Sequence, residues 1–285
     1  MKLALDCIPC FQRQALQASR FSAASEELQG RVVREVMSLL LTLDWSTTPP
    51  LIARQVHRIV RDVTQNSDPY LSVKRECNRK ALELYPDLRS LVDESTYPLE
   101  NAVKLSIAGN IIDFGAKESF DLRNTIEEVL GSELTVNDID SLKRDLRTAR
   151  TIALLADNAG EIVFDRIMLE TIIHNHPNVQ KVTLVVKGEP TINDAMREDV
   201  EEVGLTSLPQ VEVFDEGVGM GSRQDPEFLE MIKDHDIVLS KGMGNYEGLS
   251  DQTFIYFLLM VKCGIVSSDI GLPVGSTVLK APTGE

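Results

Sequence analysis

The residues best suited to chemistry are Asp157 and Asn158, which follow directly on an apolar run, Thr151 to Ala156. Ala159-Gly160-Glu161 then lead into a long helical pattern. Ligands of open α/β sheets bind beyond the carboxyl ends of the strands, so a strand that ends in a carboxylate and a carboxamide can carry a site. Oxygen donors suit a hard cation such as Mg²⁺ or Mn²⁺, and the helix start offers backbone N–H groups to an anion.

A third oxygen ligand for the same cation is Asp194, in the pair Asn193-Asp194. Asp157, Asn158 and Asp194 would fill three positions of an octahedral ion, with water and a substrate phosphate at the others. Helix capping is the ordinary alternative for Asp157 and for Asn193-Asp194. Glu161 is expected to reach a metal-bound water, or to favour the positive end of its helix.

Polar, Gly-rich sequence follows four successive apolar strands, which indicates one ligand-binding rim rather than four ordinary turns. These tips are 157–161, 187–190 with 193–194, 215–222 and 240–247. Lys187 and Lys241 each follow a strand and precede a glycine, where a lysine can neutralise charge that develops on a phosphoryl group. A solvent-exposed lysine is the alternative at each position. We assign catalytic roles to Asp157, Glu161 and Lys241.

The glycines of the third tip, Gly217, Gly219 and Gly221, resemble a phosphate-binding loop. They match neither the GxGxxG dinucleotide pattern nor the GxxxxGK[ST] nucleotide pattern, so nicotinamide and nucleotide-hydrolysis functions lose their main support. The substrate contacts expected from the tips are Lys187, Gly217, Gly219, Asn245 and Glu247.

A second candidate site is the pair Cys7-x-x-Cys10, which has a metal or redox spacing and begins a helix, where a thiolate is favoured. The pair is only half of a Cys₄ zinc site, and Cys77 and Cys263 are remote in sequence. Two half-buried cysteines without a ligand are the alternative. The four histidines have no zinc-protease spacing.

Composition excludes several classes of partner. The 285 residues carry a formal net charge of -15, which disfavours binding to nucleic acid. Hydrophobic residues make up 43% and charged residues 26%, as in ordinary soluble proteins. No apolar run approaches the ~20 residues of a membrane span. The first residues do not resemble a signal peptide, and four cysteines without one indicate reduced thiols in the cytoplasm.

The elements that must position these side chains divide at about residue 148. Residues 1–148 are predicted to form a helical N-terminal domain, because apolar positions recur at helical spacing between clear breaks. Its helices are expected at 7–20, 25–43, 51–64, 68–85, 99–111, 121–130 and 137–148, the fourth ending before Pro86.

Residues 149–285 are predicted to form the catalytic domain, in which short apolar strands alternate with helices. This alternation favours a parallel sheet with helices on its faces. Strands are expected at 151–156, 181–186, 211–214, 236–240, 254–261 and 276–279, and helices at 161–175, 192–203 and 226–235.

Taken together, the motifs resemble the DUF89 family, which includes metal-dependent damage-control phosphatases and ARMT1-like proteins. The resemblance is carried by DNAGE at 157–161, KG at 187–188, ND at 193–194 and KGMGNYE at 241–247. CIPC at 7–10 and GNIID at 109–113 resemble its microbial branch, which carries extra cysteines. The resemblance covers nearly the whole chain.

The resemblance implies an α/β fold, with a Rossmann-like three-layer αβα sandwich against a mostly helical N-terminal domain. It also implies one divalent cation, Mg²⁺, Mn²⁺, Co²⁺ or Ni²⁺, held by the three oxygen ligands named above. Lys241 matches the phosphate-side lysine of the family. Asn110 and Asp113 match a helical motif that closes over the site, and we expect them to contact substrate.

We therefore expect a metal-dependent phosphomonoester hydrolase that acts on small phosphometabolites, such as sugar phosphates or damaged cofactor derivatives. A haloacid-dehalogenase mechanism is disfavoured, because that family has a second aspartate where Ala159 stands. Two other classes stay open. One is an S-adenosylmethionine-dependent carboxyl methyltransferase, which the glycines of the third tip permit. The other is a non-catalytic metal-binding module that uses Cys7 and Cys10.

Overall fold

A seven-stranded sheet forms the middle layer of the protein in the computed structural model, which describes residues 1–109, 126, 128, 130–217 and 225–284. The strand order is β1-β7-β6-β5-β2-β3-β4, and neighbouring strands run parallel except β6 and β7. The strands are β1 (Val136–Asn137), β2 (Thr151–Leu155), β3 (Lys181–Lys187), β4 (Val211–Glu216), β5 (Ile237–Lys241), β6 (Ile255–Met260) and β7 (Thr277–Lys280).

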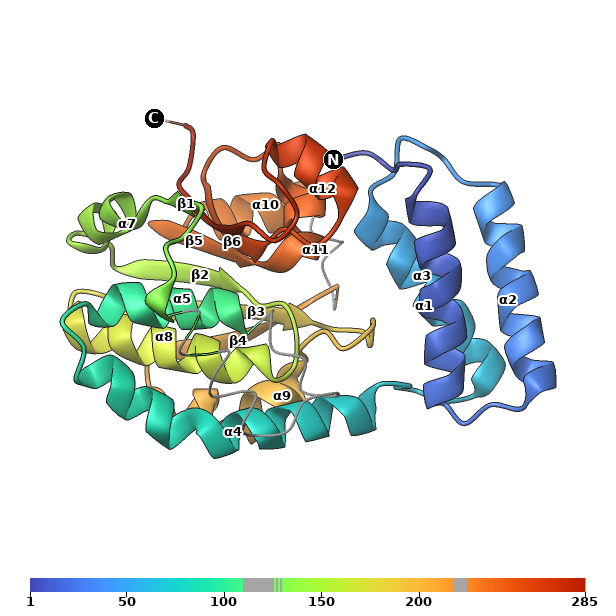
Figure 1. Cartoon of the computed structure of the whole chain (residues 1–285), viewed down its shortest axis with the longest axis horizontal. Coiled ribbons are helices and arrows are strands. Elements are labelled where there is room, and N and C mark those ends of the chain that lie inside the picture. The colour runs from blue at the N-terminus through green and yellow to red at the C-terminus, as the bar shows by residue number, and fades with distance from the viewer. Residues whose placement is uncertain (110–125, 127, 129, 218–224, 285) are drawn as a thin grey trace.

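Helices cover both faces of the sheet, as Figure 1 shows. One face carries α4 (Leu71–Asp93), α5 (Pro98–Ala108), α7 (Ile139–Leu146), α8 (Glu161–Asn175) and α9 (Arg197–Glu202), followed by the short 3₁₀ helix η1 (Leu205–Ser207). The other carries α10 (Pro226–Lys233), α11 (Gly242–Leu249) and α12 (Gly264–Ile270). This architecture confirms the predicted α/β fold class.

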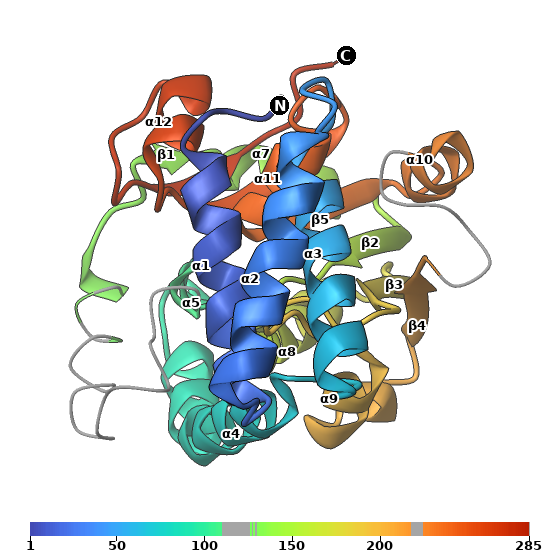
Figure 2. The same cartoon turned by 90° about the vertical axis from the view of Figure 1, so that its right-hand side faces the viewer.

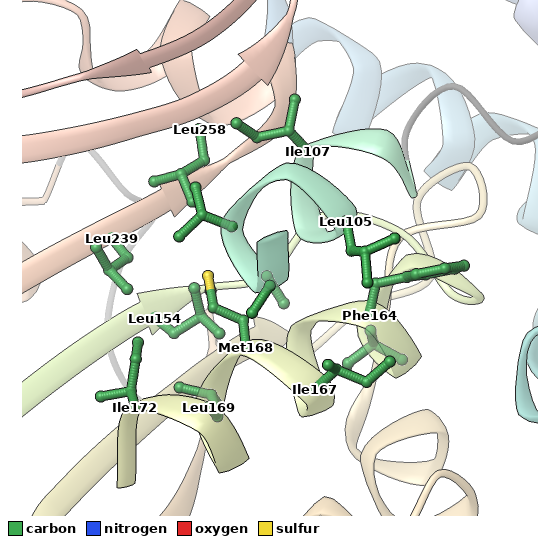
Figure 3. Close-up of a cluster of buried hydrophobic side chains, with 14 of the residues drawn as sticks. Leu105, Ile107, Leu154, Phe164, Ile167, Met168, Leu169, Ile172, Leu239 and Leu258 are labelled. Atoms are coloured by element: carbon green, nitrogen blue, oxygen red, sulfur yellow. The ribbon is translucent and has the colours of Figure 1, made fainter. Parts of the chain in front are cut away.

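The strands are apolar throughout because both of their faces are buried. Along β2, Ile152 and Leu154 belong to the core beneath α8, whereas Ala153 and Leu155 belong to the core on the opposite face. Figure 3 shows the first of these cores, where side chains of three neighbouring strands meet α5 and α8. The sheet is thereby held rigidly behind the polar tips of its strands.

Helices α1 (Cys7–Phe21), α2 (Glu26–Leu41) and α3 (Pro49–Thr64) lie side by side at one end of the molecule (Figures 1 and 2). They share a core of their own, which includes Phe11, Val32 and Val56. Ile192, in the loop after β3, packs against this core. We call α1–α3 the helical cap.

Two predicted helices differ from the structure. Helix α4 continues through Pro86 to Asp93, because Leu84, Leu88 and Val92 extend one apolar stripe into the core beneath α8. The prediction that this helix ends before Pro86 was therefore wrong. The helix predicted at 192–203 is only Arg197–Glu202, since the preceding residues form a loop in which Ile192 has a φ of 49°.

Several expectations concern sequence outside the described residues or are not tested. Parts of the helices predicted at 99–111 and 121–130 lie outside them. The division at residue 148 stays a prediction, although β1 pairs with β7 and α5 packs against α8. No helix in the described ranges is both long and apolar enough to cross a membrane.

Candidate active site

A cavity of about 480 Å³ opens where β2, β3, β4 and β5 end, against helices α1 and α3 of the cap. From β2 the chain passes to β3 and then β4 on one side, whereas β5 pairs with the opposite edge of β2. The change of direction between β2 and β5 is where open α/β sheets bind ligands. The volume is typical of small-molecule sites.

The loops that follow β2 and β3 are joined by backbone hydrogen bonds. Ala195 N donates to Asp157 O at 2.8 Å, and Ala159 N donates to Asn193 O at 2.9 Å. Asn158 and Asp194 form an isolated antiparallel bridge, and Asp157 and Asp194 both line the cavity. The structure thus brings together the three predicted ligands, although 36 residues separate the first from the last in the numbering.

The Asn158 side chain connects two carboxylates. Its Nδ2 donates to Asp157 Oδ2 at 3.0 Å and to Glu161 Oε1 at 2.7 Å. With the nitrogen engaged, the amide oxygen is the atom that Asn158 can offer to a cation.

Glu161, the first residue of α8, is buried behind these ligands. Burial and then the charge of Asp157 raise the pKa of Glu161, while Lys241 acts in the opposite direction. The donor set therefore fits a divalent cation, since a cation beside Asp157 would offset this crowded negative charge. Within the described ranges, no three His, Cys, Asp or Glu side chains gather as a metal site.

Gly242 gives the Asp157 carboxylate its space. It begins α11 with a φ of +75°, and a Cβ added there would lie 1.8 Å from Asp157 Oδ2. The backbone at Gly242 therefore packs directly against the Asp157 carboxylate. Any larger side chain at this position would displace that carboxylate.

Lys241 lies beneath the cavity and is outside the set of residues that lines it. Its side chain is 1% exposed, and its Nζ donates to Asp165 Oδ1 at 2.7 Å and to Ser106 O at 2.7 Å. Burial opposes its charge, but Asp165 and Glu161 outweigh that effect and raise the pKa of Lys241. Sequence reasoning missed Asp165. The available signal was its spacing four residues after Glu161, on the same face of a helix.

Three further predicted contacts follow β3 and β5. Lys187 lines the cavity and forms an ion pair with Glu216, Nζ to Oε2 3.0 Å. Glu247 also lines it, and burial followed by the charge of Asp157 raises the pKa of Glu247 to about 7, against the N-terminal ammonium. Asn245 lines the cavity and donates to the carbonyl oxygens at the end of β2, at 3.1 and 3.3 Å.

Gly217 ends the described part of the third tip with a φ of +85°. Asn110, Asp113, Gly219 and Gly221 lie outside the described residues.

Three cysteines line the same cavity: Cys7 and Cys10 of α1, and Cys263 before α12. Cys77 lies apart, buried in the core beneath α8. Burial raises the pKa of the Cys7 thiol, and neighbouring Glu247 and the other two thiols act in the same direction. A second metal or redox site at Cys7 and Cys10 stays a prediction.

Sequence reasoning also missed Arg54, which reaches the cavity from α3. The available signal was the spacing of Arg54, Arg58 and Arg61, which places them on one side of a helix.

The chain is similar to known proteins over almost its full length. A family model described as the damage-control phosphatase ARMT1-like domain matches residues 3–278. An uncharacterized protein of Methanocaldococcus jannaschii is 32% identical, with 98% of this chain and 95% of that protein covered. A damage-control phosphatase of Archaeoglobus fulgidus is 32% identical, with 98% and 99% covered. The crystal structure of a DUF89 family protein from Pyrococcus horikoshii matches with a TM-score of 0.88 and 27% identity, covering 99% of this chain and 100% of that one.

Proposed function

The chain belongs to the damage-control phosphatase ARMT1-like family, and from that premise we propose that it is a divalent-metal-dependent phosphatase. Its substrates would be small phosphomonoesters, such as sugar phosphates or damaged cofactor derivatives. The observation that carries the proposal is that Asp157 and Asp194 line a cavity where the strand order changes direction, with Asn158 bridged to Asp194. We also propose that the protein works in the reducing cytoplasm, where its four cysteines would stay thiols.

Asp157, Asn158 and Asp194 would hold the cation. When bound, Mg²⁺, Mn²⁺, Co²⁺ or Ni²⁺ supplies a Lewis acid for the phosphoryl oxygens and favours ionisation of water.

The remaining groups act through charge and proton exchange. Lys187 places a positive charge on the cavity wall, where it can stabilise charge on phosphoryl oxygens. Lys241 acts from beneath, because its buried ammonium offsets the carboxylates of Asp157 and Glu161. Glu247, with a pKa of about 7, can accept or release a proton inside the cavity near neutral pH.

The direct test is hydrolysis of p-nitrophenyl phosphate with each of the four cations. We expect Asp157→Ala to abolish the metal-dependent activity while its circular dichroism spectrum matches the wild type. Asp140→Ala is the matched control, because that carboxylate is 97% exposed, and it should keep wild-type activity. Full activity in Asp157→Ala would rule out the assignment.

A further inference from the structure

Three arginines of α3 share the carboxylate of Glu189, which lines the cavity. Glu189 accepts from Arg54 Nη2 at 2.9 Å, from Arg58 Nη2 at 3.2 Å and from Arg61 Nη2 at 3.1 Å. Hydrogen bonding to Arg54, against the effect of burial, lowers the pKa of Glu189 to about 2, so the carboxylate is ionised at neutral pH. One negative charge against three guanidinium groups leaves the cluster with an excess of positive charge.

Among the three, Arg54 is the arginine that lines the cavity. Its side chain is 27% exposed, whereas Arg58 is 54% exposed and lies outside the lining. Arg61 also lies outside the lining and donates to Pro190 O as well as to Glu189. A guanidinium has five N–H donors. In the part of the chain that the structure describes, the hydrogen bond of Arg54 is the one to Glu189.

Gly217, directly after β4, leaves room for the Arg54 guanidinium. A Cβ added to Gly217 would lie 2.8 Å from Arg54 Nη2, so the guanidinium rests directly against the backbone there. Arg54 is thus held between the tips of β3 and β4, with donors left for a ligand in the cavity.

We propose that Arg54 binds a second anionic group of the substrate, a carboxylate or an additional phosphate. This inference rests on the proposed function and narrows its substrate class. The fork of guanidinium donors matches either group. The rest of the wall supports a carbon chain between the two anionic groups, because Phe11, Pro49 and Ile192 line the cavity on the cap side.

Charged side chains of both signs line the cavity. Besides Arg54 the cations are Arg13 and Lys187, and Lys187 is paired with Glu216, Nζ to Oε2 3.0 Å. If the one phosphoryl group of a substrate binds at the cation, that substrate offers no second anionic group to Arg54. A substrate with a second anionic group would gain a charge-assisted hydrogen bond.

The experiment compares phosphate esters that differ by one anionic group. For a carboxylate, the pairs are 3-phosphoglycerate with glycerol 3-phosphate and 6-phosphogluconate with glucose 6-phosphate. For a phosphate, the pair is fructose 1,6-bisphosphate with fructose 6-phosphate. We expect wild-type kcat/KM to favour the member with the additional anionic group in at least one pair by about tenfold or more. Equal values in all three pairs would overturn the inference.

Two matched variants separate substrate binding from structure. Arg54→Met and Arg58→Met each remove one ion pair to Glu189, but only the first changes the cavity wall. We expect the preference to fall to about one in Arg54→Met and to persist in Arg58→Met. Equal loss in both variants would assign the effect to the ion-pair cluster and overturn the inference.

A binding measurement keeps this inference distinct from the proposed function. Calorimetric titration compares 3-phosphonopropionate with propylphosphonate, neither of which is a phosphate ester. Tighter binding of the first to wild type, lost in Arg54→Met alone, would support the role of Arg54 even if no ester were hydrolysed. Failure to hydrolyse any ester would refute the phosphatase. Hydrolysis of p-nitrophenyl phosphate without any preference in either assay would refute only the role of Arg54.

Discussion

At the scale of single residues, the side chains behind the cavity matter as much as those that line it. Lys241 was predicted beside the phosphate, and the structure places its ammonium between Asp165 and the carbonyl of Ser106. Asp165 is 1% exposed, and Ser106 Oγ also donates to its Oδ1 at 2.6 Å. A buried lysine needs such a partner, because an uncompensated charge in the core is costly.

We predict that Asp165→Asn lowers the free energy of unfolding by about 3 kcal/mol, because the charge of Lys241 would remain buried without its counter-ion. The double replacement Asp165→Leu with Lys241→Met should recover part of this loss. Urea denaturation of the two variants and the wild type measures both effects. A loss below about 1 kcal/mol for Asp165→Asn would contradict a buried ion pair.

The sequence predicted the residues of short motifs better than isolated charges. Asp157, Asn158 and Asp194 stood out because they follow apolar strands. Arg54 and Asp165 did not, since one charge on a helix looks the same whether it faces solvent or a cavity. Their roles depend on partners more than 50 residues away, Glu189 for Arg54 and Lys241 for Asp165.

At the scale of elements, local pattern predicted the strands well and the loops less well. The strands from β2 to β7 lie within two residues of their predicted positions, because continuous apolar runs bounded by polar tips mark buried parallel strands. Helices α11 and α12 were not predicted, as their glycine-containing starts resemble turns. The residues directly before α9 were predicted as helix, but they form a loop. This loop brings Asp194 next to Asn158.

The start of α11 provides a test of this arrangement. We predict that Gly242→Ala reduces phosphatase activity at least 100-fold, since its Cβ would displace the Asp157 carboxylate by steric overlap. The positive φ adds a stability cost of about 1 kcal/mol. Activity assays and thermal denaturation measure the two effects separately.

Gly271→Ala is the matched control, since its φ of +76° is also positive, a Cβ there meets nothing within 4 Å, and the residue is outside the set that lines the cavity. It should keep wild-type activity. Similar activity in the two variants would show that Gly242 does not constrain Asp157.

At the scale of the whole molecule, the cap is joined to the sheet close to the cavity. Its core receives Ile192 from the loop after β3, and its arginines reach Glu189 in the same loop. The sequence predicted helices in this region, but not how they pack, because amphipathic patterns do not specify a partner. Helices α1 and α3 thus form one wall of the cavity, and the ion pairs of α3 to Glu189 connect this wall to the loop after β3.

This cluster predicts a pH-dependent stability. The pKa of Glu189 is about 2 in the folded protein against an ordinary value of 4.5. A carboxylate whose pKa is lower in the folded protein stabilises the fold. This stabilisation is complete above the pKa of the unfolded chain and is lost as the pH falls through the pKa of the folded protein. We therefore expect Glu189→Gln to lower the free energy of unfolding by about 1 kcal/mol at pH 7.

The difference between wild type and Glu189→Gln should shrink as the pH falls from about 4.5 towards 2. Denaturation midpoints measured at several pH values across this interval check the prediction. A difference that stays constant down to the lowest pH at which both proteins fold would contradict it.

The proposed activity depends most on three oxygen ligands meeting around one cation, and calorimetric titration with Mn²⁺ tests this directly. We predict one Mn²⁺ per chain in the wild type, with binding weakened at least tenfold in Asp157→Asn and in Asp194→Asn and unchanged in Asp140→Asn. Equal Mn²⁺ affinity in all four proteins, or no Mn²⁺ binding to the wild type, would contradict the central claim.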